Sequence, residues 1–128
     1  MGNEGRCIES LGSSLEEKMT IFGKIIRGEI PAEKVFENER ILAIKDLHPA
    51  APVHLLIMPK KEIPNLQSLQ PEDLPLISEI ILVAQKLAEE FDIADGYRFL
   101  TNNGEDGGQT IFHLHFHLIG GRRLMHLG

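Results

Sequence analysis

The sequence is poor in the residues that define several classes of protein. Its single cysteine, Cys7, cannot form an internal disulfide bond, and the lack of a disulfide framework is typical of a reducing compartment. No apolar stretch approaches the ~20 residues that a membrane-spanning helix needs. The net charge is -6, so there is no positive field to hold nucleic acid nonspecifically. We expect a cytoplasmic protein with no membrane or nucleic-acid partner, and any phosphate-bearing ligand must be small and held by local groups.

The length of 128 residues corresponds to one ordinary domain, and the hydrophobic fraction of 42% and charged fraction of 25% are typical of globular proteins. Residues 1–18 lack the apolar core of a secretory signal and are too acidic for a typical transit peptide. Because Gly, Ser, Asn and Glu dominate there, we predict a mobile N-terminal extension over 1–18 and a folded domain over 19–128.

Segments with strand character outnumber helical ones in the folded domain. A short helix is predicted at 22–27, with Thr20 as its N-cap and Gly28 as its stop. Patterns of apolar residues between turns predict strands at 35–37, 41–45, 53–58, 97–101 and 111–119. Because short turns connect most of them, we predict an α+β fold with an antiparallel sheet of about five strands.

One long helix is predicted at 71–91, where apolar residues recur at helical spacing. Pro71 suits its first position, whereas Pro75 lies inside the first turns and could kink it. Leu74 and Val83 widen the apolar stripe to about half the circumference, and Leu82 interrupts the polar side. Because one sheet needs a narrower stripe, we expect a second surface to contact this helix.

Three of the six histidines fall within five residues, at every second position of the run from Phe112 to Leu118. Side chains in a strand alternate faces. His113, His115 and His117 are therefore predicted to share one face, and the intervening residues the apolar face: Phe112, Leu114, Phe116 and Leu118. Glycines at 104, 107 and 108 precede the run and allow close approach of the backbone to a ligand.

Three interpretations of these histidines compete. A metal site is disfavoured because positions four apart are separated by ~13 Å along a strand, so three rings converge poorly on one ion. A purely structural role would crowd three ionisable rings on one face, and burying them for packing alone is costly. Nucleophilic catalysis fits best, because a neutral imidazole can attack phosphorus while its neighbours supply protons or hydrogen bonds. His115 lies in the middle and is the candidate nucleophile.

The pattern His113-x-His115-x-His117 followed by two apolar residues resembles the signature of the histidine-triad (HIT) nucleotide-binding superfamily. Other segments resemble its Hint branch: 21–31, Asp46, 52–54, 59–61, 97–98, 102–104 and 120–122. The resemblance covers about residues 20–126 and implies a HIT-like fold with one long helix and one short N-terminal helix. It also implies a purine nucleoside 5'-phosphoramidate hydrolase that needs no metal or other cofactor and forms a homodimer.

The resemblance further implies roles for individual residues. His115 would attack the α-phosphorus, His117 would contact the phosphate and handle protons, and His113 and His54 would orient His115. The substrate would be held at the phosphate and leaving group by Asn102, Gln109 and Thr110, at the ribose by Asp46, and at the purine by an apolar slot of Phe22, Ile25, Ile44 and Leu47. Read without the resemblance, Phe22, Ile25 and Ile44 are better explained as core, and Asp46 and Asn102 could serve turns.

Two departures and two alternatives stay open at this point. Ser is common in the family where this chain has Thr110, and this chain has no tryptophan, whereas animal members of the branch end in a tryptophan-containing tail that helps define leaving-group preference. The preferred amine therefore stays undetermined. The alternative functions are a nucleotide-binding sensor or scaffold module and a dinucleoside polyphosphate hydrolase, whose branch lacks the opening seen at 22–31.

Overall fold

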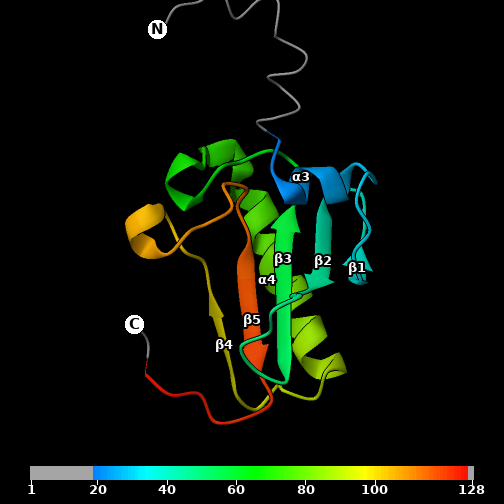
Figure 1. Ribbon diagram of the computed structural model, residues 1–128, viewed down its shortest axis with the longest axis vertical. Coiled ribbons are helices and arrows are strands. Elements are labelled where there is room, and N and C mark those ends of the chain that lie inside the picture. Colours follow the sequence, from blue (N-terminus) through cyan, green and yellow to red (C-terminus); the bar gives the residue numbers. More distant parts are fainter. Residues whose placement is uncertain (1–18, 127–128) are drawn as a thin grey trace, which may run out of the picture.

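The computed structural model describes residues 19–126, so the extension predicted at 1–18 lies outside the described part of the chain. Five strands form one sheet in the order β1-β2-β3-β5-β4, and every neighbouring pair is antiparallel (Figure 1). The strands are β1 (Lys34–Glu37), β2 (Ile41–Lys45), β3 (Val53–Pro59), β4 (Tyr97–Leu100) and β5 (Phe116–Gly120). The predicted α+β fold with five antiparallel strands is confirmed.

Two helices cover opposite faces of the sheet. The long helix α4 (Leu74–Glu90) buries Ile80 and Leu87 against alternate strand residues, among them Leu55 and Leu118. The short helix α3 (Ile21–Ile26) buries Phe22 and Ile25 against the other face, where the strand residues are Leu42, Ile44, Leu56 and Met58. None of the helices in residues 19–126 is long and apolar enough to cross a membrane.

The start of α3 follows the predicted capping pattern. The hydroxyl Oγ1 of Thr20 accepts a hydrogen bond from the N–H of Gly23 at 3.0 Å, which satisfies one of the free donors at the helix start. After the helix, Gly28 adopts a φ of +81°, a left-handed conformation that favours glycine. This short helix therefore lies in a fixed position against the sheet, and Phe22 with it.

The long helix begins later than predicted. Residues Pro71–Asp73 form a separate 3-10 turn, and the α-helix starts at Leu74. Pro75 consequently lies in the first turn of the helix. Backbone N–H groups in the first turn have no partner within the helix, so a proline fits there without causing the predicted kink. Leu74, Ile81 and Leu82 are exposed, at 55%, 45% and 64%, so part of the wide stripe faces outward.

The histidine strand is shorter than predicted, because β5 begins at Phe116 and not at Ile111. In the β3–β5 register Ile57 pairs with Phe116, so continuation of the ladder by two more residues would place Pro59 opposite Leu114. Proline has no N–H to donate, and the N–H of Leu114 instead donates to the carbonyl of Ile63 at 2.7 Å. The prediction that all three histidines share one strand is therefore wrong, and Phe112, predicted to be apolar core, is 43% exposed.

Candidate active site

A cavity of about 370 Å³ opens on the α3 side of the sheet. Its apolar wall includes all four residues predicted for the purine slot: Phe22, Ile25, Ile44 and Leu47. The first three are buried, whereas Leu47 is 85% exposed and forms the open edge. Four predicted polar residues line the same cavity: Asp46, Thr110, His115 and His117. An apolar slot thus meets a polar, histidine-bearing end, which suits a ligand with a flat base and a phosphate.

His115 presents a free ring nitrogen at this polar end. Its Nδ1 lies 2.7 Å from the carbonyl oxygen of His113, so Nδ1 carries the proton and donates it to that carbonyl. The other nitrogen, Nε2, then carries a lone pair. Phe22 contacts the imidazole edge-to-face, with ring centroids 4.8 Å apart, and restricts its rotation. The ring of His115 is therefore held in one orientation, with the lone pair that a neutral nucleophile requires on Nε2.

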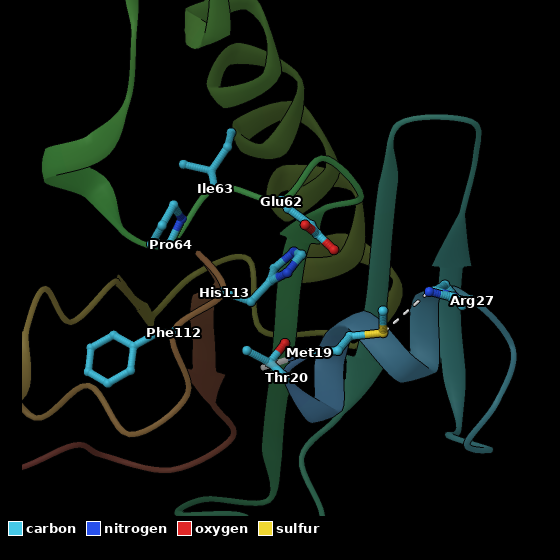
Figure 2. A pocket seen from close by; sticks show the side chains of 8 residues that line it. All are labelled: Met19, Thr20, Arg27, Glu62, Ile63, Pro64, Phe112 and His113. Carbon is cyan, nitrogen blue, oxygen red and sulfur yellow. Dashed lines mark hydrogen bonds between the residues drawn. The ribbon is translucent and has the colours of Figure 1, made fainter. Parts of the chain in front are cut away.

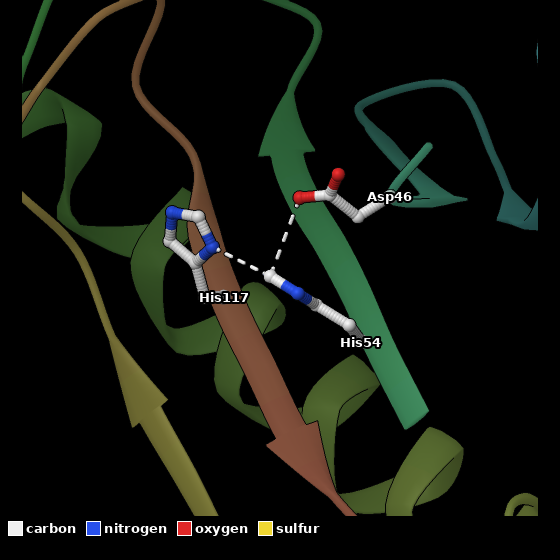
Figure 3. Close-up of side chains that lie close together, drawn as sticks. All are labelled: Asp46, His54 and His117. Atoms are coloured by element: carbon white, nitrogen blue, oxygen red, sulfur yellow. Dashed lines mark hydrogen bonds and ion pairs between the residues drawn. The ribbon is translucent and has the colours of Figure 1, made fainter. Parts of the chain in front are cut away.

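A second histidine pair has its protons assigned by hydrogen bonds in the same way. The backbone N–H of Ala50 donates to Nδ1 of His54 at 2.9 Å, so the proton of neutral His54 lies on Nε2. That Nε2 lies 2.9 Å from Nδ1 of His117 and 3.3 Å from Oδ2 of Asp46 (Figure 3). His117 must then accept at Nδ1 and hold its own proton on Nε2, from which it can donate a hydrogen bond into the cavity.

Burial keeps these rings neutral near pH 7. Burial, together with the neighbouring His115 and His54, lowers the pKa of His117 to about 4. Burial is also the main cause that lowers the pKa of His115 and that of His54, although Asp46 opposes the effect in both. A neutral ring is the form that attacks phosphorus, so the electrostatics of the site match the tautomers that the hydrogen bonds select.

His113 supports the site from behind and does not line the cavity. Its ring is buried, and its Nε2–H donates to the carbonyl of Pro59 at 2.8 Å, while its own carbonyl fixes His115. The ring borders a different cavity, of about 410 Å³, between α3 and the segment that contains Glu62, with Phe112 at its rim (Figure 2). His113 therefore contacts His115 through its backbone oxygen and not through its ring.

The remaining predicted residues lie along the glycine-rich loop. The side chain of Gln109 is buried, and its amide makes three hydrogen bonds to the backbone, at Gly104, Pro64 and Ile111. Gln109 therefore shapes this loop, and contact with a phosphate would require it to release one of those bonds. Asn102 is half-buried beside Gly108 and does not line the cavity, so the phosphate roles of Asn102 and Gln109 stay predictions.

Two groups that hydrogen-bond to His54 and His115 were not predicted from the sequence. The N–H of Ala50 sets the tautomer of His54, and the hydroxyl of Thr101 donates to the carbonyl of His115 at 2.6 Å. A backbone donor carries no residue-type signal, so nothing in the sequence could have marked Ala50. Thr101 stands at the end of a predicted strand, where a threonine is ordinary.

Asp46, His54 and His117 form a cluster whose candidate ligand atoms all lie within 4.8 Å of one another. Histidines that ligate a metal usually donate a hydrogen bond from the other ring nitrogen. In His54 that other nitrogen, Nδ1, accepts a hydrogen bond from Ala50, so its Nε2 is protonated and offers no lone pair. The donor set therefore fits a proton relay and does not fit a metal ion.

The chain belongs to the HIT domain family, whose model matches residues 27–124. It is 58% identical to a HIT-like protein of Chlamydia pneumoniae over 106 residues, which cover 83% of this chain and 96% of that protein. Among solved structures it is similar to a HIT family hydrolase from Clostridium thermocellum, with a TM-score of 0.81 and 45% identity over 84% of this chain and 95% of that one. A HIT family hydrolase from Legionella pneumophila gives a TM-score of 0.80 and 44% identity, over 82% and 95% of the two chains.

Proposed function

We propose that this protein is a hydrolase of the Hint branch that cleaves the P–N bond of purine nucleoside 5'-phosphoramidates. The observation that carries the proposal is the oriented lone pair on Nε2 of His115 at the polar end of an apolar cavity. Similarity to structures named HIT family hydrolases supports hydrolysis in general. The Hint branch and the phosphoramidate substrate rest on the resemblance of the sequence and on the chemistry of the site.

The reaction has two steps. First, Nε2 of His115 attacks the α-phosphorus and the P–N bond to the amine breaks. The amine takes up a proton from solvent, while the Nε2–H of neutral His117 donates a hydrogen bond to the phosphate. This gives a nucleotidyl-histidine. Water then attacks the same phosphorus, its proton returns to solvent, and the bond between phosphorus and His115 breaks to release AMP or GMP. His54 stays neutral and keeps the proton of His117 on the correct nitrogen throughout.

The rest of the cavity would bind the nucleoside. The purine fits the slot of Phe22, Ile25, Ile44 and Leu47, where burial of an apolar ring is favourable but does not distinguish adenine from guanine. The carboxylate of Asp46 lies at the rim, between the slot and the histidines, and can accept hydrogen bonds from ribose hydroxyls. Thr110 is exposed in the cavity, where its hydroxyl can donate to the phosphate.

The test is steady-state hydrolysis, in EDTA, of an adenosine 5'-phosphoramidate that carries a fluorescent amine. We expect turnover by the wild type and a loss of roughly a thousandfold or more in His115→Ala, because removal of a nucleophile removes the covalent pathway. His126→Ala is the matched control, since this exposed histidine lies outside the site. Binding of AMP without turnover by the wild type would contradict the proposal and favour a nucleotide-binding module. Cleavage of diadenosine polyphosphates in preference to the phosphoramidate would favour the polyphosphate hydrolase.

A further inference from the structure

His54 is enclosed by the loop that precedes it in the sequence. The N–H of Asp46 donates to the carbonyl of His54 at 3.0 Å and closes the loop at its neck. Within the loop, the N–H of Ala50 donates to Nδ1 of the His54 ring. The position of one exposed peptide group at Ala50 thus decides which nitrogen of a buried ring carries the proton.

The chain that leaves β5 holds this loop from outside. Gly121 has a φ of +97° and packs so closely on Pro52 that a Cβ at Gly121 would lie 3.0 Å from the Cβ of Pro52. The next residue, Arg122, donates from Nη2 to the carbonyl of Ala50 at 2.8 Å. Its Nη1 donates to the carbonyl of Arg123 at 2.9 Å, which aims the planar guanidinium. Ala50 is therefore held through its carbonyl by Arg122 while its N–H holds His54.

We propose that Arg122 is a positioning residue that fixes the tautomer of His54 and, through it, that of His117. The relay runs from Arg122 to Ala50, then to Nδ1 of His54, and from Nε2 of His54 to Nδ1 of His117. Arg122 itself does not line the nucleotide cavity, so it acts only through these bonds. Its consequence for turnover rests on the proposed function, whereas its effect on the tautomer does not.

Loss of the guanidinium has a specific chemical result. When Ala50 is free to move, Nδ1 of His54 loses its donor and can carry the proton itself. Nε2 of His54 would then be an acceptor that faces two other acceptors, Nδ1 of His117 and the carboxylate of Asp46. His117 would respond by moving its proton to Nδ1, which removes the Nε2–H hydrogen-bond donor from the cavity. Turnover should fall while nucleotide binding is preserved.

The experiment measures tautomers directly. Two-bond ¹⁵N–¹H correlation spectra of histidine-labelled protein at pH 7 report which nitrogen of His54 is protonated. We expect the Nε2–H form in the wild type, a mixture or the Nδ1–H form in Arg122→Ala, and partial recovery in Arg122→Lys, which can still donate one hydrogen bond to Ala50. Arg123→Ala is the matched control, because only the backbone carbonyl of Arg123 takes part in the relay, and it should resemble the wild type.

Kinetics on the phosphoramidate separate this inference from the proposed function. We expect kcat of Arg122→Ala to fall roughly tenfold to a hundredfold with KM nearly unchanged, since a misplacement of about 1 Å can cost roughly a hundredfold. An unchanged His54 tautomer in Arg122→Ala would overturn the inference, even if the wild type turns over substrate. If the His54 tautomer changes in Arg122→Ala but the wild type has no phosphoramidase activity, the relay is supported and the proposed function is contradicted. Should Arg122→Ala fail to fold, Arg122→Lys against Arg123→Ala gives the same comparison.

Discussion

At the scale of the residue, three hydrogen bonds decide what the histidines can do. A carbonyl acceptor beside His115 places its proton on Nδ1, whereas a backbone donor beside His54 places its proton on Nε2. The bond between His54 and His117 then leaves the proton of His117 on Nε2. Chemically identical side chains thereby differ in which ring nitrogen carries the proton, because each has a different neighbour, and the proposed roles of nucleophile, relay and hydrogen-bond donor rest on this difference.

The lowered pKa values predict the pH dependence of activity. Because His115 and His117 stay neutral below the ordinary histidine pKa, we expect kcat/KM to remain high at pH 6 and to fall as the pH approaches 4. A pH profile of kcat/KM for the phosphoramidate tests this. A fall centred at or above pH 6.5 would show that the rings titrate as exposed histidines do.

The same shifts predict how stability depends on pH. The unfolded chain takes up protons on these histidines near pH 6.5, whereas the folded pKa of His117 is about 4, so their contribution to stability is complete above pH 6.5 and is lost as the pH falls toward 4. We expect the Tm of the wild type to drop across that window and the drop to be smaller, by roughly 5 °C, in His117→Gln. Thermal denaturation at pH 7, 5.5 and 4 measures it, and equal drops in both proteins would contradict the assignment.

Asp46 should contribute to nucleotide affinity. Asp46→Asn keeps an oxygen that can accept the N–H of His48, as Oδ1 of Asp46 does at 2.8 Å, but removes the charge offered to the ribose. We expect AMP binding to weaken by roughly 1.5–3 kcal/mol, the scale of a hydrogen bond to a charged group. Calorimetric titration of AMP measures the change, with Asp95→Asn, exposed and outside the cavity, as control. Equal affinity in wild type and Asp46→Asn would remove Asp46 from the ribose site.

At the scale of the element, the short helix α3 matters more than its length suggests. Phe22 on this helix contacts the ring of His115, and Phe22 and Ile25 form a wall of the nucleotide cavity. A helix this short has little stability of its own and depends on packing and capping. The cap at Thr20 thus connects a local sequence signal to the orientation of the nucleophile.

Removal of that cap should be measurable. Thr20→Ala deletes the hydroxyl that accepts the N–H of Gly23, so we expect the free energy of unfolding to fall by about 1 kcal/mol. Thr20→Ser retains the hydroxyl and should stay close to the wild type. Urea denaturation of the three proteins provides the comparison. A loss in Thr20→Ser as large as that in Thr20→Ala would point to the methyl group of Thr20 and away from the cap.

At the scale of the whole molecule, the sheet formed by residues 19–126 ends in two outermost strands, β1 and β4. The strand β4 is outermost in the sheet order, and an unpaired strand edge can accept another chain. Beside it, Ile81 and Leu82 on α4 and Tyr97 on β4 are exposed apolar or aromatic residues. We propose that a second copy of this chain covers this surface, as the resemblance to the Hint branch implies. The outward-facing part of the apolar stripe on α4 would then contact the second copy. That copy would be the second surface expected from the width of the stripe.

A charge on this surface should separate the copies. Leu82→Glu places a carboxylate where the side chain is 64% exposed, so folding should survive, but association would bury an unpaired charge. We expect the wild type to sediment as a dimer and Leu82→Glu as a monomer at the same concentration. Leu66→Glu, at a leucine that is 45% exposed outside α4 and β4, should remain dimeric. A monomeric wild type in analytical ultracentrifugation would contradict the homodimer.

Much of the fold could be read from local patterns. Strands β1 to β4 and helix α3 lie within two residues of their predicted limits, because alternating apolar residues, Thr20 and Gly28 mark them locally. The start of β5 was missed because it depends on Pro59, a residue of another strand that cannot donate to the ladder. Likewise, nothing in the sequence around Gln109 indicates that its side-chain amide forms hydrogen bonds with the backbone of Gly104, Pro64 and Ile111.

The sequence by itself determined the chemistry available to this protein: the spacing of His113, His115 and His117, the apolar residues of the purine slot, and the two helices around one antiparallel sheet. Only the tertiary structure decided which nitrogen of each ring is free, because that depends on the backbone conformation at His113 and Ala50 and on the contact between His54 and His117, which are far apart in sequence. It also divided the histidines, placing His115 and His117 in the cavity and His113 behind it. The sequence gives the type of each residue, whereas the protonated nitrogen and the orientation of each ring depend on how the folded backbone and the neighbouring strand surround it.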